Sequence, residues 1–280
     1  MAFAYSKRGR GNFDPGDKRP HRISRSKIDL FVECPRCFYL DQRLGIKRPD
    51  SPPFSLNNAV DLLLKKEFDV HRKNKSAHPL MVHHHIDAVP FDHRDLEVWR
   101  DALRSGIEYL HSPTNLSVRG GVDDVWVNSS GELIIVDYKA TSKTSEINLD
   151  AEWQDGYKRQ MEVYQWLFEK NGFAVSKTGY FVYVNARQDR EGFDERLDFE
   201  THLLPYTGNS AWIEPVIFKI KECLVGDLPS PDEVCAFCAY RKFAAEAAVN
   251  GNSASKKTSK VKEKNEKNRS QESLQSNIFG

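Results

Sequence analysis

The sequence lacks any long apolar run, and none of its stretches reaches the ~20 consecutive apolar residues that a membrane-spanning helix needs. Its first 21 residues are rich in Gly, Arg, Lys and Asp, and they lack the apolar segment of a secretory signal. We therefore expect a cytoplasmic protein with no membrane partner. In that compartment the five cysteines would stay reduced and serve as metal ligands or core residues.

An excess of charge of one sign is also missing, because 41 Lys and Arg residues face 40 Asp and Glu residues. A global basic field therefore cannot be the reason for binding nucleic acid. Apolar residues make up only 39% of the chain, but they include 16 Phe, 10 Tyr and 5 Trp. A chain of 280 residues with these aromatics can bury one large core or two small ones.

The composition divides the chain into three parts. Residues 1–22 form a polar, basic arm, and residues 246–280 consist mainly of Lys, Glu, Ser and Asn, too polar to bury a core. We expect both ends to be disordered around a folded domain at residues 23–245. Either end could act elsewhere, since the basic arm could contact phosphates or serve only solubility.

Apolar spacing predicts the elements of that domain. Helical periods predict helices at about 24–40, 55–68, 96–110, 155–170 and 212–224. Runs of β-branched residues predict strands at 122–127, 133–138, 179–185 and 196–204. In the helix that begins at Ser55, residues such as Leu56, Leu63 and Phe68 form one apolar stripe. This order of elements favours an α/β domain with a mixed sheet and helices on both faces.

A hairpin signal joins the strands at 122–127 and 133–138. If Ser129, Ser130 and Gly131 form a three-residue loop with Gly131 in the left-handed conformation, Asn128 faces Glu132. The register of the whole hairpin follows from that pairing, because opposite residues keep a constant sum of their numbers.

Counting outward in this register, Asp123 faces Asp137, and Lys139 lies on the same face two residues further on. Facing carboxylates repel each other unless a cation lies between them, and Mg²⁺ or Mn²⁺ accepts oxygen ligands from such a pair. A register shifted by one residue would replace Asp123 by Asp124. In the register preferred here, we expect the replacement of Asp124 by Ala to have a mild effect.

These residues lie in known motifs. Asp137-Tyr138-Lys139 resembles a (D/E)-x-K element, and Gly120-Gly121-Val122-Asp123 resembles the Gly-x-x-Asp element upstream of it. Gln160 and Tyr164 resemble the Gln-x-x-x-Tyr signature on the following helix. In this order, across about residues 24–243, the chain resembles the RecB-like branch of the PD-(D/E)XK nuclease superfamily.

The resemblance implies a restriction-endonuclease-like core and a metal-dependent DNA nuclease acting in DNA repair, recombination or foreign-DNA processing. It implies catalytic roles for Asp123, Asp137, Lys139, Gln160 and Tyr164. Mg²⁺ or Mn²⁺ would be held by Asp123, Asp137 and the backbone carbonyl of Tyr138. Core packing accounts for Tyr164 equally well, and Gln160 could simply be an exposed helical side chain.

The sequence departs from the family at one position. Many RecB-like nucleases carry a metal-binding His on an N-terminal helix, and the comparable stretch from Ser55 to Asp61 contains neither Gly nor His. Asp61 or His71 could replace that ligand. The alternative function is a catalytically degenerate DNA-binding or scaffolding module on the same fold, although the intact Asp-x-Lys element favours the enzyme.

Two Cys-x-x-Cys pairs, Cys34 with Cys37 and Cys235 with Cys238, offer four thiolates to one metal centre. Such a centre would join the N- and C-terminal parts of the domain. Cys34-Pro35-Arg36 and the late cysteines resemble the iron–sulfur members of the family, of AddB type or CRISPR-associated. We expect a 4Fe–4S cluster, with Zn²⁺ as the alternative. Cys223 remains outside the set and is expected in the core.

Two further motifs can be explained without a functional role. His83, His84 and His85 are consecutive, and neighbouring residues of a regular element point in different directions, so a polar loop is the better prediction than a metal site. The stretch from Gln275 to Phe279 resembles the peptide by which bacterial DNA enzymes bind the sliding clamp. An unstructured end with an apolar pair explains it as well.

Overall fold

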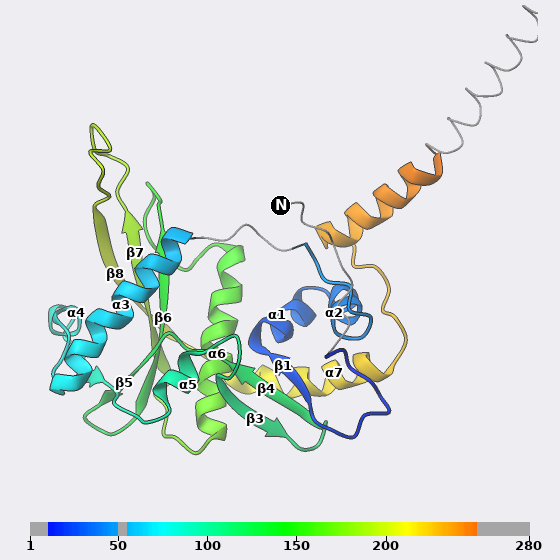
Figure 1. Ribbon diagram of the computed structural model, residues 1–280, viewed down its shortest axis with the longest axis horizontal. Coiled ribbons are helices and arrows are strands. Elements are labelled where there is room, and N and C mark those ends of the chain that lie inside the picture. Colours follow the sequence, from blue (N-terminus) through cyan, green and yellow to red (C-terminus); the bar gives the residue numbers. More distant parts are fainter. Residues whose placement is uncertain (1–10, 50–54, 251–280) are drawn as a thin grey trace, which may run out of the picture. The chain divides into compact units, whose positions relative to one another are not determined.

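The computed structural model describes residues 11–49 and 55–250 (Figure 1). The chain forms two compact units, one up to Pro229 and one from Ser230 onward. Most of the tail predicted at residues 246–280 lies outside the described residues, as does the first half of the predicted arm. The second half of that arm is folded, because Phe13 is buried and a strand begins at His21. The folded part therefore begins before the predicted boundary at residue 22.

A five-stranded mixed sheet has the order β2-β5-β6-β7-β8. β6 and β7 are parallel, and the other neighbouring strands are antiparallel. The strands are β2 (Ala88–Pro90), β5 (Asp124–Asn128), β6 (Leu133–Thr141), β7 (Thr178–Ala186) and β8 (Phe199–Thr207). All but the short β2 were predicted, with boundaries shifted by a few residues.

A smaller sheet has the order β1-β4-β3 and comprises β1 (His21–Ser24), β3 (Ile107–His111) and β4 (Leu116–Gly120). The longer helices are α1 (Arg25–Glu33), α2 (Pro35–Gln42), α3 (Ser55–Asn74), α6 (Asp155–Lys170) and α7 (Ile213–Val225). The short ones are α4 (Pro79–His83), α5 (Leu96–Arg100), η1 (Glu152–Gln154) and η2 (Ser210–Trp212).

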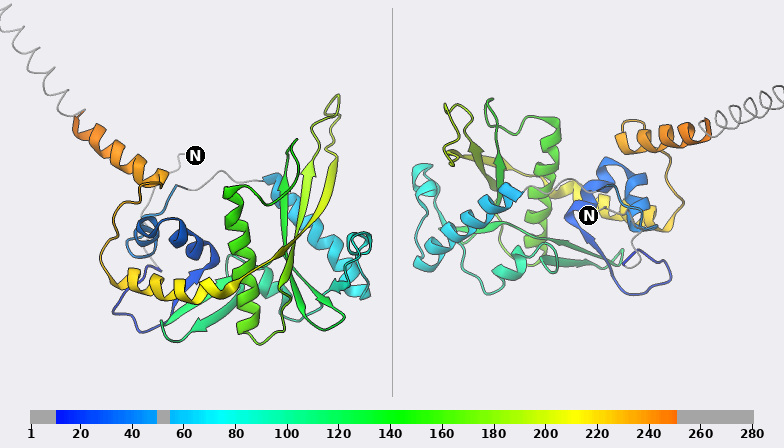
Figure 2. Two further views of the ribbon diagram at one scale, coloured as in Figure 1. Left: turned by 180° about the vertical axis from the view of Figure 1, so that it is seen from behind. Right: turned by 45° about the horizontal axis from the view of Figure 1, so that its top comes forward.

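Helices cover both faces of the five-stranded sheet, as predicted. Figure 1 shows α3 on one side of the sheet and α6 on the other, and the view from behind in Figure 2 shows the same order. α3 contacts β2 and β6, whereas α6 contacts β6 and also β3 and β4 of the smaller sheet. The end of β6 is therefore enclosed between two helices. Along the described residues, no helix has the length and apolar character required to cross a membrane.

The core between α3 and the sheet contains aromatic and aliphatic side chains from seven elements, which are α3, α4 and all five strands of the sheet. Its buried members are Phe68, Met81, Ala88, Trp126, Ile134, Val136, Tyr138, Val182, Val184 and Leu203. On β6 these are the even-numbered residues, so the odd-numbered residues Asp137 and Lys139 point to the opposite face, toward α6.

The apolar residues of α3 do not form the single stripe predicted for them. Phe68 is buried in the core and Leu64 packs against it, whereas Leu56 and Leu63 are exposed. The prediction was wrong for Leu56 and Leu63 because the helix carries two rows of apolar residues. One row faces the core, and the neighbouring row, which contains Leu56 and Leu63, faces away from it.

The helix predicted at 24–40 is divided into α1 and α2 at Cys34. Proline disfavours the helical conformation of the residue before it, and Cys34, which precedes Pro35, is extended with φ −163° and ψ 102°. Cys34 thereby becomes the N-cap of α2, and its sulfur accepts the N–H of Cys37 at 3.4 Å.

The helix predicted at 96–110 was wrong in its second half. α5 ends at Arg100, and the carboxylate of Asp101 accepts the N–H groups of Leu103 and Arg104 instead of continuing the helix. Gly106 has φ +80°, and a Cβ there would lie 2.4 Å from the carbonyl oxygen of Gly120. This close approach sends the chain into β3, which pairs with β4.

Candidate active site

The β5–β6 hairpin has the predicted register. Asp124 pairs with Val136, the N–H of Asn128 donates to the carbonyl of Glu132 at 3.1 Å, and Gly131 has φ +81°. A left-handed glycine closes the three-residue loop as expected.

Extending the pairing by one residue places Asp123 beside Asp137. Oδ2 of Asp123 accepts the N–H of Tyr138 at 2.8 Å. Asp137 has no exposed surface, and it forms an ion pair with Lys139. The structure therefore brings Asp123, Asp137 and Lys139 together at one end of the hairpin.

Burial determines the charges of this group. Desolvation raises the pKa of Asp137, and the negative charge of Asp123 adds to the shift, although Lys139 opposes it. Burial alone would lower the pKa of Lys139, but the attraction of Asp137 and Asp123 outweighs it, and the net shift is upward. Lys139 therefore stays protonated at neutral pH and acts as a hydrogen-bond donor.

α6 supplies the second wall of the group. Nε2 of Gln160 donates to Oδ1 of Asp137 at 2.7 Å and to the Tyr164 hydroxyl at 3.1 Å. The Nζ of Lys139 donates to Oε1 of Gln160 at 3.4 Å. Gln160 is 9% exposed and Tyr164 is 4% exposed, so the alternative of an exposed glutamine is excluded. Tyr164 is both a packed side chain and a partner of Gln160.

Tyr157, on the same face of α6, was not predicted as part of the site. The Nζ of Lys139 lies 4.3 Å from the centre of its ring, within the range of a cation–π interaction. The signal was present in the sequence, because Tyr157 precedes Gln160 by three residues and Tyr164 by seven, which places all three on one helical face.

The glycine of the Gly-x-x-Asp element has a packing role. A Cβ on Gly120 would lie 2.5 Å from Cε1 and 2.9 Å from Cδ1 of Tyr164. No side chain fits there without moving the Tyr164 ring, which hydrogen-bonds Gln160. Glycine at this position therefore lets α6 approach β4 closely enough to reach Asp137.

Asp124, the neighbour of Asp123, belongs to a different buried network. It has no exposed surface and pairs with both Arg72 and Arg100, the latter at 3.1 Å, while the Tyr138 hydroxyl donates to its Oδ2 at 2.9 Å. Nε of Arg100 also donates to the carbonyl of Asp123 at 3.2 Å. The expectation that replacing Asp124 would be mild is therefore inconsistent with its surroundings. No local sequence pattern predicted the contact of either arginine with Asp124, because both arginines are distant from Asp124 in the sequence.

Of the two residues suggested in place of the family's histidine, Asp61 lies close to the hairpin. Asp61 lies on α3 in a cleft of about 250 Å³ that is also lined by Asp123, Tyr138, Lys139 and Tyr157. Burial raises the pKa of Asp61, and Asp123 adds to that shift. Of the two proposed substitutes, only Asp61 reaches the cleft.

His71 points elsewhere. Its Nδ1 is 3.1 Å from the hydroxyl of Ser76, and its ring packs against the ring of His78. His71 is therefore not the replacement for the family's histidine.

The residues at the hairpin fit a hard divalent ion. Two carboxylates, Asp123 and Asp137, lie side by side, and a neutral carboxyl on Asp137 is favoured only by its burial and by Asp123. A divalent cation between the carboxylates would offset both effects by stabilising their charged forms, and Mg²⁺ and Mn²⁺ prefer oxygen ligands of this kind.

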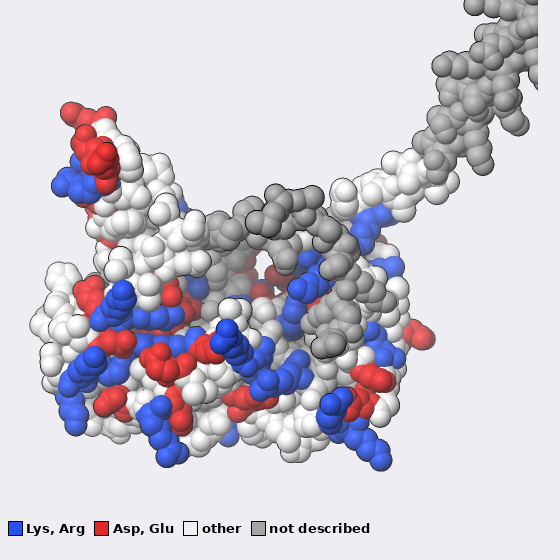
Figure 3. Space-filling model, in the orientation of Figure 1, with Lys and Arg blue, Asp and Glu red and all other residues white. Residues whose placement is uncertain are grey.

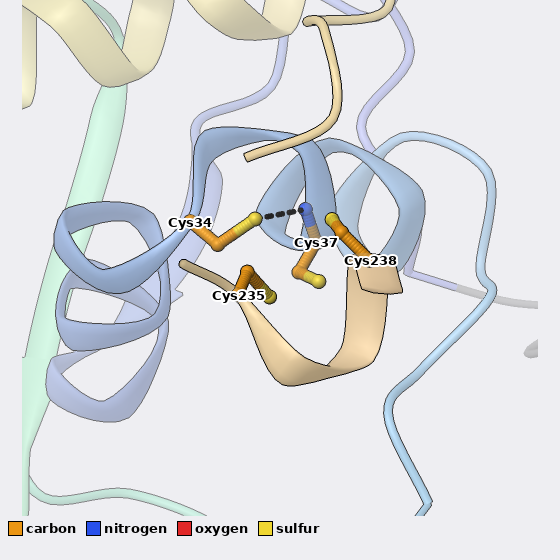
Figure 4. A group of neighbouring side chains, drawn as sticks. All are labelled: Cys34, Cys37, Cys235 and Cys238. Carbon is orange, nitrogen blue, oxygen red and sulfur yellow. Dashed lines mark hydrogen bonds between the residues drawn. The ribbon is translucent and has the colours of Figure 1, made fainter. Parts of the chain in front are cut away.

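The four paired cysteines are all buried, and their sulfur atoms lie within 4.8 Å of one another (Figure 4). Cys34 and Cys37 flank the start of α2, and Cys235 and Cys238 each come 201 residues after their counterparts in the first pair, so a metal on all four would join the N- and C-terminal parts. Four thiolates suit Zn²⁺ as well as an iron–sulfur cluster.

Cys223 is half-buried, and burial raises the pKa of its thiol to about 11.

Within residues 11–49 and 55–250, no comparable metal-ligand group includes His83, His84 or His85. His83 and His84 line a larger pocket of about 610 Å³ that contains none of the residues of the Asp-x-Lys element.

Basic and acidic side chains are interspersed on the face shown in Figure 3, which agrees with the balanced composition.

Fold and site together define a nuclease-like α/β protein. A family model described as "PD-(D/E)XK nuclease superfamily" matches residues 22–243, and the chain belongs to that superfamily. A similar solved structure is titled "Crystal structure of SSO0001": it is 16% identical, with a TM-score of 0.40, over 76% of this chain and 80% of that chain. No curated protein matches the chain.

Proposed function

We propose that the protein is a metal-dependent deoxyribonuclease of the RecB-like branch that hydrolyses phosphodiester bonds of DNA. The observation that carries the proposal is the convergence of Asp123, Asp137 and Lys139 at one end of the hairpin, with Gln160 bonded to both members of the Asp-x-Lys pair. A role in DNA repair, recombination or foreign-DNA processing, in the cytoplasm, agrees with such an activity.

Each side chain has a separate task. Asp123, Asp137 and the carbonyl of Tyr138 would hold Mg²⁺ or Mn²⁺, and the ion would supply stabilisation of charge on the scissile phosphate and a lowered pKa of water. Lys139 donates to the attacking water and orients it. Gln160 fixes Asp137 and Lys139 relative to each other, and Tyr164 fixes Gln160 in turn.

The test is a cleavage assay with Mg²⁺ or Mn²⁺ on linear and circular single strands and on duplex DNA. Asp137→Asn should abolish cleavage and leave the far-ultraviolet circular dichroism spectrum unchanged. Lys139→Ala should keep Mn²⁺ binding and lose about a hundredfold in rate, because it acts on the water. Lys66→Met, an exposed position on α3, is the control and should cleave like the wild type.

A wild-type protein that cleaves neither DNA nor RNA with either ion would reject the enzyme. If that protein still bound DNA, the function would be the alternative, a degenerate DNA-binding or scaffolding module on this fold. Cleavage of circular as well as linear strands would define an endonuclease, and cleavage of linear strands alone an exonuclease.

The proposal extends to two further components. The cysteine set would hold a 4Fe–4S cluster, by resemblance to the AddB-type and CRISPR-associated exonucleases. Gln275–Phe279, outside the described residues, would bind a bacterial sliding clamp. Deletion of residues 275–280 should abolish clamp binding and leave cleavage of free DNA intact, whereas equal clamp binding with and without these residues would reject the motif.

A further inference from the structure

The cleft beside the hairpin contains a second lysine that the family motifs do not include. Lys65 extends from α3, and its Nζ is 2.8 Å from Oδ2 of Asp61 and 3.7 Å from Oδ1 of Asp123. Only 20% of the Lys65 side chain is exposed. Ion pairs in such partly buried positions are screened by salt less than pairs at the open surface.

The two oxygens of Asp123 have different partners. Oδ2 accepts the N–H of Tyr138 at 2.8 Å, which leaves Oδ1 facing Lys65. An ion shared by Asp123 and Asp137 gains most from Oδ1, because among the described residues no backbone N–H donates to that oxygen, whereas Oδ2 accepts the N–H of Tyr138. The divalent ion and the ammonium group of Lys65 therefore require the same oxygen, and their like charges repel each other.

Asp61 is the closer partner of the same ammonium, at 2.8 Å against 3.7 Å for Asp123. Asp61 and Lys65 are four residues apart on α3, the spacing at which an acidic and a basic side chain pair across one helical turn. Lys65 can therefore leave Asp123 and keep an ion pair. A lysine that pairs with two carboxylates offsets their charge in the absence of a metal ion and can release one of them when an ion binds.

We propose that Lys65 is the counter-ion of these carboxylates when no metal is bound, that it competes with the divalent ion for Asp123, and that it keeps only its pair with Asp61 when the ion binds. Asp61 then serves as the partner of Lys65 and not as the replacement for the family's metal-binding histidine. The inference rests on the proposed function for the position of the ion. Its consequence is that Lys65 weakens metal binding, so that the protein requires a higher concentration of free divalent ion than its carboxylates alone would need.

Isothermal titration with Mn²⁺ tests the inference on the full chain. Lys65→Met should bind Mn²⁺ about tenfold more tightly than the wild type, equivalent to ~1.4 kcal/mol. In the presence of EDTA the same variant should melt at a lower temperature, because Asp123 and Asp61 then lack a counter-charge. Lys65→Arg keeps the charge and should retain both wild-type values. Lys66→Met, the exposed neighbour, should also resemble the wild type.

The outcomes separate this inference from the nuclease itself. Equal or weaker Mn²⁺ binding by Lys65→Met would overturn the role of Lys65, and Lys65→Gln serves as the uncharged variant if the methionine protein does not fold. No cleavage by the wild type, together with tighter Mn²⁺ binding by Lys65→Met, would reject the nuclease and keep the counter-ion. No Mn²⁺ binding by the wild type or by either uncharged variant would overturn both.

Discussion

Asp123 and Asp124 are neighbours in the chain with opposite tasks, because successive side chains of a strand point to opposite faces. Asp123 faces the Asp-x-Lys element and the cleft that contains Lys65, and Asp124 faces the buried side of α3, where it pairs with Arg72. Arg100 connects the two, since it pairs with the Asp124 carboxylate and holds the Asp123 carbonyl. The buried network thus fixes the backbone from which the site residues extend.

Replacing Asp124 should therefore damage the fold more than replacing Asp123. Asp124→Ala removes the fully buried carboxylate that Arg72 and Arg100 share and leaves them only the partly exposed Asp69, and breaking a buried pair in this way costs about 3–5 kcal/mol. Asp123→Ala relieves repulsion from Asp137 and should leave the free energy of unfolding in EDTA nearly unchanged. Urea denaturation measures both. A loss for Asp124→Ala no larger than for Asp123→Ala would contradict this account.

Tyr157 should contribute through its ring and not through its hydroxyl, because the ring face meets the ammonium of Lys139. Tyr157→Phe should keep kcat within about twofold, whereas Tyr157→Leu should lower it about three- to tenfold, the range expected for a partly buried cation–π pair. Equal kcat values for the two variants would show that the ring does not position Lys139.

At the scale of elements, the sequence predicted those helices and strands that are determined by interactions between residues close together in the chain. The β5–β6 hairpin was predicted in register, because a glycine loop and β-branched strands determine it within 20 residues. The helix at 96–110 was wrong beyond Arg100, because a close approach between Gly106 and Gly120 directs the chain into β3. Arg72 and Arg100 were missed for the same reason: their partner Asp124 is 52 and 24 residues away.

The contact between β4 and α6 yields a further prediction. Gly120→Ala places a methyl group against the Tyr164 ring, and such overpacking costs about 1–3 kcal/mol. Cleavage should fall as well, because Tyr164 holds Gln160. Gly16→Ala is the control, since its nearest neighbour, Asp14 Oδ1, is 3.4 Å away.

A double-mutant cycle identifies the cause. In a Tyr164→Ala background the ring is gone, so Gly120→Ala should cost distinctly less than in the wild type. An equal cost in both backgrounds would mean that the methyl group meets the backbone or Leu167 and not Tyr164.

At the scale of the whole molecule, the cysteine set is the feature that connects distant parts of the sequence. Metal bound by residues that converge only in the folded chain contributes its binding free energy to folding. Cys34 and Cys37 are separated from Cys235 and Cys238 by almost the entire domain, and all four thiols are buried within 4.8 Å of one another. Metal content and stability should therefore change together.

Anaerobically purified protein should be brown, with broad absorbance near 400 nm, as the iron–sulfur prediction requires. A colourless protein with one equivalent of zinc would replace the cluster by an ion and keep the connection, whereas a metal-free protein of full stability would reject both. Cys34→Ser and Cys238→Ser should each lose the metal and lower the melting temperature. Cys223→Ser should keep the metal and the wild-type melting temperature, because Cys223 lies outside the set. The sulfur of Cys223 contacts the carbonyl of Pro35 at 3.9 Å, and a serine hydroxyl can donate to the same carbonyl.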